Sequence, residues 1–250
     1  MATVWTNKTP FPSHNEHLII DADSYNQWMR DACYVCDPDS LTNEALEDSG
    51  TSNRYVEDIG GYDFFVRTFP THVQVFSLFG FNPGMQKVRS ELAIAQGRRR
   101  ASVSFTGPVH IPILETRGGD IWMSLTPNEI FTQRAGLRKA KGRVLIAGLG
   151  MGWLTKEVLA KKSVKQVTQV ELIPEVVSFF GGPLLESSDK LEIIQGDVWD
   201  LLSTDIDASQ YDTLLFDIWL GYGEAYWDSK FKSLKRSHDR VWGWGDFEPR

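Results

Sequence analysis

Cysteine, long apolar runs and targeting signals are scarce or missing in this chain. Cys33 and Cys36 are the two cysteines among 250 residues, too few for a disulfide framework. No apolar run approaches the roughly 20 residues of a membrane span. The N-terminal MATVWTNKTPFPS lacks the basic region and apolar core of a signal peptide. We therefore expect a soluble cytoplasmic protein with no membrane partner.

Positive charge is also in the minority. The chain has 26 lysines and arginines against 33 aspartates and glutamates, a net charge of −7. Without an excess of basic residues there is no general attraction for nucleic acid. We therefore expect no nucleic-acid partner, although these totals are compatible with a local basic patch.

The most informative stretch present is KGRVLIAGLGMGWLTKEVLAKKSVKQVTQVE, residues 141–171. An apolar run, Val144–Ala147, meets a glycine-spaced turn; a helical segment and a second apolar run ending on Glu171 follow. Glycines let the backbone approach a ligand, and the next helix offers free N–H groups at its N-terminus. A carboxylate at the tip of the second strand is placed to bind ribose hydroxyls. The pattern predicts a nucleoside-cofactor site that includes Gly148, Gly150, Gly152 and Glu171.

The glycine spacing excludes two common phosphate sites. A dinucleotide fingerprint needs a glycine where Trp153 stands, and no G-x-x-x-x-G-K-[ST] sequence is present. Taken alone, G-x-G-x-G is also compatible with a turn that needs glycines only for packing.

Two later strand ends strengthen the ligand interpretation. Leu191–Gln195 reads as a strand followed by Asp197, and Thr213–Phe216 reads as a strand followed by Asp217. Ligands of open parallel sheets bind outside the carboxyl ends of the strands, so both aspartates are candidates. For Asp197, capping of the next helix is an equally good explanation.

The phrases VLIAGLGMG, VTQVELIPEVV, LEIIQGDVWDLL and YDTLLFDIW resemble the class I S-adenosylmethionine (SAM)-dependent methyltransferases, spermidine synthase-like branch, over roughly residues 108–240. The resemblance implies a Rossmann-like, doubly wound, mainly parallel α/β sheet. It also implies that the three glycines line the methionine and ribose part of SAM and that Glu171 holds the ribose hydroxyls. Asp197 would face the adenine amine with Val198 beside the ring, and Asp217 would lie at the reacting centre as a base or an amine-orienting acid. Alternatively, Asp217 is a structural carboxylate.

The chain departs from spermidine synthases at three positions. Met151 replaces the aspartate that recognises the aminopropyl group of decarboxylated SAM, and Leu220 replaces a second aspartate that binds the polyamine. Ile173 replaces an aspartate that only caps a helix. We therefore expect a SAM-dependent methyltransferase with a small-molecule acceptor. The alternatives are a polyamine aminopropyltransferase that uses decarboxylated SAM, and a non-catalytic scaffold or regulatory protein.

Aromatic residues follow the glycine motif and the strand-end acids. Trp153, Trp199 and Trp219 are interpreted either as walls of an acceptor pocket or as helix–sheet packing, and Tyr222 lies on the loop after Asp217. Rings in the pocket would favour an aromatic acceptor or a methylatable amine, because aromatic faces attract cations.

The chain divides near residue 105. Residues 1–105 form a smaller α+β region without a recognised motif, and residues 106–250 form a β-hairpin lead-in plus the SAM-binding domain. A helix is predicted from Pro127 to about Lys139, behind a Thr126–Glu129 capping box.

After Asp217 we expect one helix, about Glu224–Ser237, and one possible strand, Val241–Gly245. The usual terminal β-hairpin has no room, so either the N-terminal strands or another subunit would cover the open sheet edge. We expect a homodimer on this ground.

A zinc site is a further possibility in the N-terminal region. Cys33 and Cys36 form a C-x-x-C pair, and His14 and His17 lie upstream as H-x-x-H. Four such ligands could bind zinc. Two small core residues and two surface histidines explain the pattern better, so we expect no metal.

Overall fold

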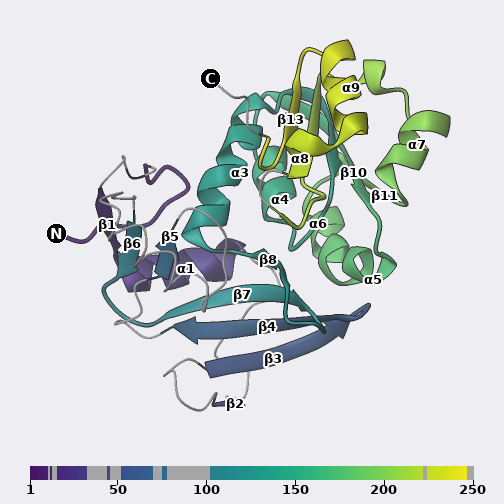
Figure 1. Ribbon diagram of the computed structural model, residues 1–250. Helices are drawn as coiled ribbons and strands as arrows, with labels where there is room; N and C mark the ends of the chain where they lie inside the picture. The colour runs from purple at the N-terminus through teal and green to yellow at the C-terminus, as the bar shows by residue number, and fades with distance from the viewer. Residues whose placement is uncertain are drawn as a thin grey trace. The chain divides into compact units, whose positions relative to one another are not determined.

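The computed structural model describes residues 1–10, 12, 16–32, 44–45, 52–69, 75–77, 102–221 and 224–246. The chain separates into two compact units, Met1–Phe131 and Thr132–Arg250 (Figure 1). The candidate residues His14, Cys33, Cys36 and Tyr222 lie outside the described residues.

The described residues of the first unit form two sheets and the helix α1. The larger sheet is antiparallel, in the order β2-β3-β4-β7-β8; its strands are β2 (Glu44–Ala45), β3 (Ser52–Ile59), β4 (Tyr62–Phe69), β7 (Val109–Thr116) and β8 (Ile121–Ser124). The smaller sheet has the order β1-β6-β5, with β1 (His17–Ile20), β5 (Val75–Ser77) and β6 (Ser102–Phe105). The helix α1 spans Ala22–Ala32, and Asp21 caps it by accepting from Ser24 N at 2.8 Å.

The compact units divide at a different place from the boundary that the sequence predicts near residue 105. Strands β7 and β8 form the expected hairpin, but β7 also pairs with β4 along its whole length, from Tyr62 opposite Thr116 to Phe69 opposite Val109. The hairpin is therefore part of the N-terminal sheet. The boundary between the compact units falls inside the helix α3 (Pro127–Lys139), between Phe131 and Thr132.

The second unit is built on a parallel five-stranded sheet, in the order β11-β10-β9-β12-β13. The strands are β9 (Gly142–Ala147), β10 (Val164–Glu171), β11 (Leu191–Gln195), β12 (Thr213–Phe216) and β13 (Val241–Gly243). Numbered from β9, this order is 3-2-1-4-5, with the switch point between β9 and β12. The predicted doubly wound, Rossmann-like fold is confirmed. Ligands bind such sheets at the carboxyl edge beside the switch point.

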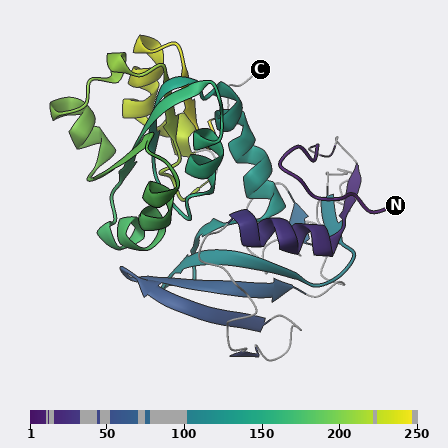
Figure 2. The ribbon, with the colours of Figure 1, turned by 180° about the vertical axis from the view of Figure 1, so that it is seen from behind.

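Helices cover both faces of this sheet (Figures 1 and 2). On one face, α7 (Val198–Thr204), α8 (Glu224–Trp227) and α9 (Ser229–Ser237) pack on the core formed around Leu145, Ala147 and Phe216. On the other face, α4 (Trp153–Leu159) contacts β10, and Thr155 donates to Gln169 at 2.6 Å. Between β10 and β11 the chain forms α5 (Pro174–Val176), a π-helical segment (Val177–Gly181) and α6 (Gly182–Ser187).

The C-terminal part differs from the prediction in two details. The single helix expected over Glu224–Ser237 is broken at Asp228, whose Oδ1 accepts from Phe231 N at 3.0 Å and caps α9. The last strand ends at Gly243 because Trp244 and Gly245 form a turn. Strands β11 and β13 are the edges of the sheet, and no described strand of the first unit pairs with either. Within the described residues, no helix is long and apolar enough to cross a membrane.

Candidate functional site

The glycine turn after β9 lies directly against the end of β12. Gly148 has a φ of +89°, a left-handed conformation that favours glycine. A Cβ at this position would lie 2.0 Å from the carbonyl oxygen of Asp217, so no side chain fits. Gly148 N also donates to Val170 O at 2.9 Å. The packing of protein backbone alone therefore requires glycine at position 148.

The other two glycines complete the turn into α4. Gly152 has a φ of +79° at the N-cap of this helix, and a Cβ there would lie 2.8 Å from Leu184 Cδ1. Gly150 also has a positive φ, +51°. Gly152 is thus explained by packing, whereas contact between a ligand and these glycines stays a prediction.

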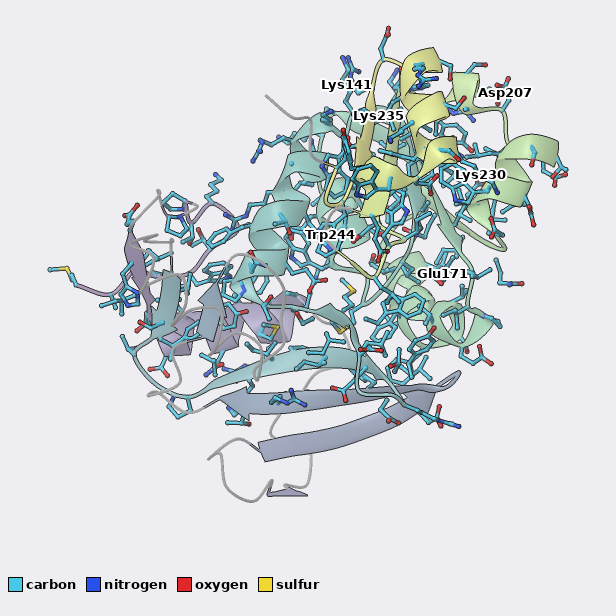
Figure 3. The ribbon with its side chains drawn as sticks, in the orientation of Figure 1. Lys141, Glu171, Asp207, Lys230, Lys235 and Trp244 are labelled. Carbon is cyan, nitrogen blue, oxygen red and sulfur yellow. The ribbon has the colours of Figure 1, made fainter. Side chains whose placement is uncertain are left out.

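Glu171 links this turn to the carboxyl end of β10. Its Oε2 accepts from Leu149 N at 2.7 Å, and its Oε1 accepts from Ile173 N at 2.9 Å. The residue is only 6% exposed. Each carboxylate oxygen can accept a second hydrogen bond, so the group is held in place while it keeps capacity for hydroxyl donors. Figure 3 shows Glu171 at this end of the unit.

Asp197 is a helix cap in this structure. It follows β11, and its Oδ1 accepts from Trp199 N at 2.7 Å and from Asp200 N at 3.3 Å, at the start of α7. The side chain is exposed, whereas Val198 is buried in the core beside Leu145 and Phe216. The capping explanation therefore holds for Asp197, and the contacts of Asp197 and Val198 with adenine stay predictions.

Asp217, at the end of β12, is paired with a buried amide. Gln133 Nε2, from α3, donates to Asp217 Oδ2 at 2.8 Å. Burial raises the pKa of the Asp217 carboxyl from 3.8 to about 7. Gln133 is fully buried, and its Oε1 has no hydrogen-bond partner among the described residues. Sequence reasoning missed Gln133, because nothing in PNEIFTQRAG marks one helical glutamine as the partner of a distant aspartate.

The three tryptophans make packing contacts, the alternative to walls of an acceptor pocket that the sequence left open. Trp153 is fully buried in the interior. Trp199 stacks on Phe216 with ring centroids 5.1 Å apart, and Trp219 meets Phe231 edge-on at 5.1 Å. Trp219 also donates its indole N–H to Asp228 at 3.2 Å. All three rings pack within the second unit, so they do not indicate an aromatic acceptor.

Three apolar residues stand where spermidine synthases have aspartates: Met151, Leu220 and Ile173. Met151 is buried, with 2% of its surface exposed, whereas Leu220 is 51% exposed. Ile173 precedes α5 without a side-chain cap, and its backbone N–H is taken up by Glu171 instead.

Among the described residues, no group of three or more histidines, cysteines and acids could hold a metal ion. Of the four residues considered for zinc, only His17 is described, and its Nε2 lies 2.9 Å from Ser104 Oγ.

No protein-family model matches the chain, and no curated protein matches it. Among solved structures, the chain is similar to a dimethyladenosine transferase from Plasmodium falciparum, with 21% identity and a TM-score of 0.35. The match covers 47% of this chain and 39% of that one, less than half of either. Such a likeness carries no argument about function, which has to be inferred from the strand order and the strand-end residues.

Proposed function

We propose that this protein is a SAM-dependent methyltransferase that acts on a small-molecule acceptor. One observation supports the proposal above the others. The glycine turn, Glu171 and Asp217 converge at the carboxyl ends of three neighbouring strands, β10, β9 and β12, beside the switch point of the sheet.

The residues present fit the nucleoside part of SAM. Glu171 is held by Leu149 N and Ile173 N with lone pairs to spare, as a diol-binding carboxylate should be. When bound, SAM supplies a methyl group that its sulfonium already activates, so the protein need contribute little beyond positioning and proton removal.

Asp217 is the proposed general base. Because burial raises its pKa to about 7, it is partly ionised at neutral pH and can accept the proton that an acceptor loses. Gln133 would orient it, since the amide holds Oδ2 and leaves Oδ1 for the acceptor. Met151 and Leu220 supply no negative charge for the aminopropyl group of decarboxylated SAM or for a polyamine, which favours methyl over aminopropyl transfer.

The test is transfer of a tritiated methyl group from SAM to a panel of amines, phenols and carboxylic acids. Asp217→Asn should lower turnover by about 100-fold or more while SAM binding is retained. Glu171→Gln should weaken SAM binding by about tenfold or more, since the variant presents an N–H₂ group where the carboxylate accepts. Asp189→Asn and Glu175→Gln, both exposed, are the matched controls and should match the wild type. Full turnover by Asp217→Asn would refute its role as the base.

A further inference from the structure

Positive charge is concentrated in one part of this acidic chain. Residues 134–165 contain nine of the 26 lysines and arginines but only one of the 33 acids, Glu157. The rest of the chain has 17 basic and 32 acidic residues. Residues 134–165 are therefore strongly basic although the whole chain has a net charge of −7.

The fold brings this segment together at the amino edge of the parallel sheet. Helix α3 ends at Lys139, β9 begins at Gly142 and β10 begins at Val164. Gly142 pairs with Val164, and its N–H donates to Ser163 O at 2.7 Å. In Figure 3, Lys141 lies at one end of the unit and Glu171 at the other. The basic surface is thus separated from the proposed cofactor edge by the length of the strands.

Two of the basic side chains have structural partners. Lys161 Nζ donates to Leu137 O at the end of α3, where a cation complements the helix dipole. Lys139 Nζ donates to Val241 O at 3.1 Å, on the edge strand β13. Stabilisation of the fold explains these two.

Helix capping does not explain the other lysines and arginines of residues 134–165. Five are exposed, and none forms an ion pair with a carboxylate of a described residue; they are Arg138, Lys141, Arg143, Lys162 and Lys165. We call these five residues the basic surface. The guanidinium of Arg143 also lies over the ring of Tyr211, 5.6 Å from its centroid.

Two acids that precede β12 in the chain accept hydrogen bonds. Asp212 Oδ2 accepts from Arg143 N at 2.8 Å. Asp207 accepts from Ser209 N at 2.9 Å and from Ser209 Oγ at 2.7 Å. Both precede β12, whereas the basic surface lies on the last turn of α3, on the first residues of β9 and β10, and in the loops that precede these two strands.

We propose that the basic surface docks the phosphate backbone of a nucleic acid. Exposed lysines and arginines without acidic partners bind phosphates through charge and counterion release, independently of sequence. The large exposed apolar residues of the described chain are Met1, Val4, Ile19, Leu172, Leu185, Leu220 and Trp227, and none belongs to this surface. It therefore lacks the apolar anchors of a protein interface or a membrane-inserted helix.

Nucleic-acid docking at the basic surface is independent of the proposed methyl transfer. The basic surface and Glu171 lie toward opposite ends of β10. On this strand Lys165 and Glu171 are about 20 Å apart at 3.3 Å per residue. Nucleic acid bound there is tethered to the protein and is not placed at Asp217.

The test is fluorescence anisotropy with a labelled single-stranded RNA of about 20 uridines, titrated over a series of salt concentrations. We expect binding whose log K falls linearly with log salt, with a slope of about −2 to −4. The triple variant Lys141→Glu/Lys162→Glu/Lys165→Glu should bind at least about tenfold more weakly and show a shallower slope.

The matched control is Lys8→Glu/Arg30→Glu/Lys230→Glu. These three residues are exposed and lie on the N-terminal segment, on α1 and at the start of α9, and their reversal changes the net charge by the same amount. The control should stay within about threefold of the wild type, since distant charges are screened. Thermal melting of both variants verifies that they are folded.

Three results would overturn the proposal. The first is no RNA binding by the wild type at low salt. The second is an equal loss of affinity in both triple variants, which would mean attraction by net charge alone. The third is tighter binding to polyglutamate or to phosphatidylserine vesicles than to RNA.

Discussion

At the residue scale, the candidate site depends on two carboxylates in different environments. Glu171 accepts hydrogen bonds from two backbone N–H groups. Asp217 is half-buried beside a neutral amide, and burial of its carboxyl raises its pKa. The two carboxyls therefore have different surroundings and can take different roles, one binding hydroxyls and the other taking up a proton.

The raised pKa of Asp217 predicts a pH-dependent cost to stability. The folded state retains the proton up to pH about 7, whereas the unfolded chain releases it near 3.8. The folded state thus binds more protons between these values, and stability falls as pH rises through this window. Asp217→Asn stays neutral, so its stability relative to wild type should increase from pH 4 to pH 7 by on the order of 2–4 kcal/mol and then level off. Chemical denaturation across this range measures the difference; a constant difference would contradict it.

The conformation and close packing of Gly148 predict that a side chain at this position destabilises the fold, whether or not a ligand is bound. Gly148→Ala should destabilise the protein by about 2–4 kcal/mol, because its Cβ would meet Asp217 O and φ is positive. Gly182→Ala is the matched control, since no atom lies within 4 Å of its Cβ and its φ is −54°. The control should be neutral or stabilising by up to about 1 kcal/mol. Equal melting temperatures of the two variants would refute the packing explanation.

At the element scale, the sequence predicts most of the second unit. Strands β11 and β12 and helix α3 match their predicted bounds, because apolar runs bounded by turn residues and a capping sequence define them locally. The features that could not be predicted from the sequence depend on tertiary contacts. The membership of β7 depends on its pairing with β4, and the inward direction of Trp153 depends on which face of α4 meets the sheet. The partnership of Gln133 with Asp217 joins residues 84 positions apart.

Asp228 divides the last helical region, and its cap can be tested. Asp228→Ala should destabilise the protein by about 1–2 kcal/mol, because Phe231 N loses its acceptor. Asp228→Asn should retain most of the stability, since asparagine caps helices equally well. Thermal unfolding distinguishes them. If both variants melt with the wild type, the break between α8 and α9 does not depend on this cap.

At the scale of the whole molecule, the open edges of the parallel sheet predict self-association. Strand β13 is an edge of this sheet, and its three residues are buried. Unpaired edge strands invite pairing with another chain, and the described strands of the first unit form their own sheets. We expect a homodimer at micromolar concentration. Light scattering coupled to size exclusion measures the mass directly, and a mass of 28.3 kDa would contradict this expectation.

The central claim is that the carboxyl edge of this sheet binds SAM. Calorimetric titration of the wild-type protein with SAM, and separately with decarboxylated SAM, tests it most directly. The account predicts saturable binding of SAM that is tighter than binding of the decarboxylated form, because Met151 and Leu220 offer no carboxylate to a polyamine substrate or an aminopropyl amine. Preference for decarboxylated SAM would contradict the assignment of methyl transfer, and binding of neither compound would contradict the claim itself and favour a scaffold role.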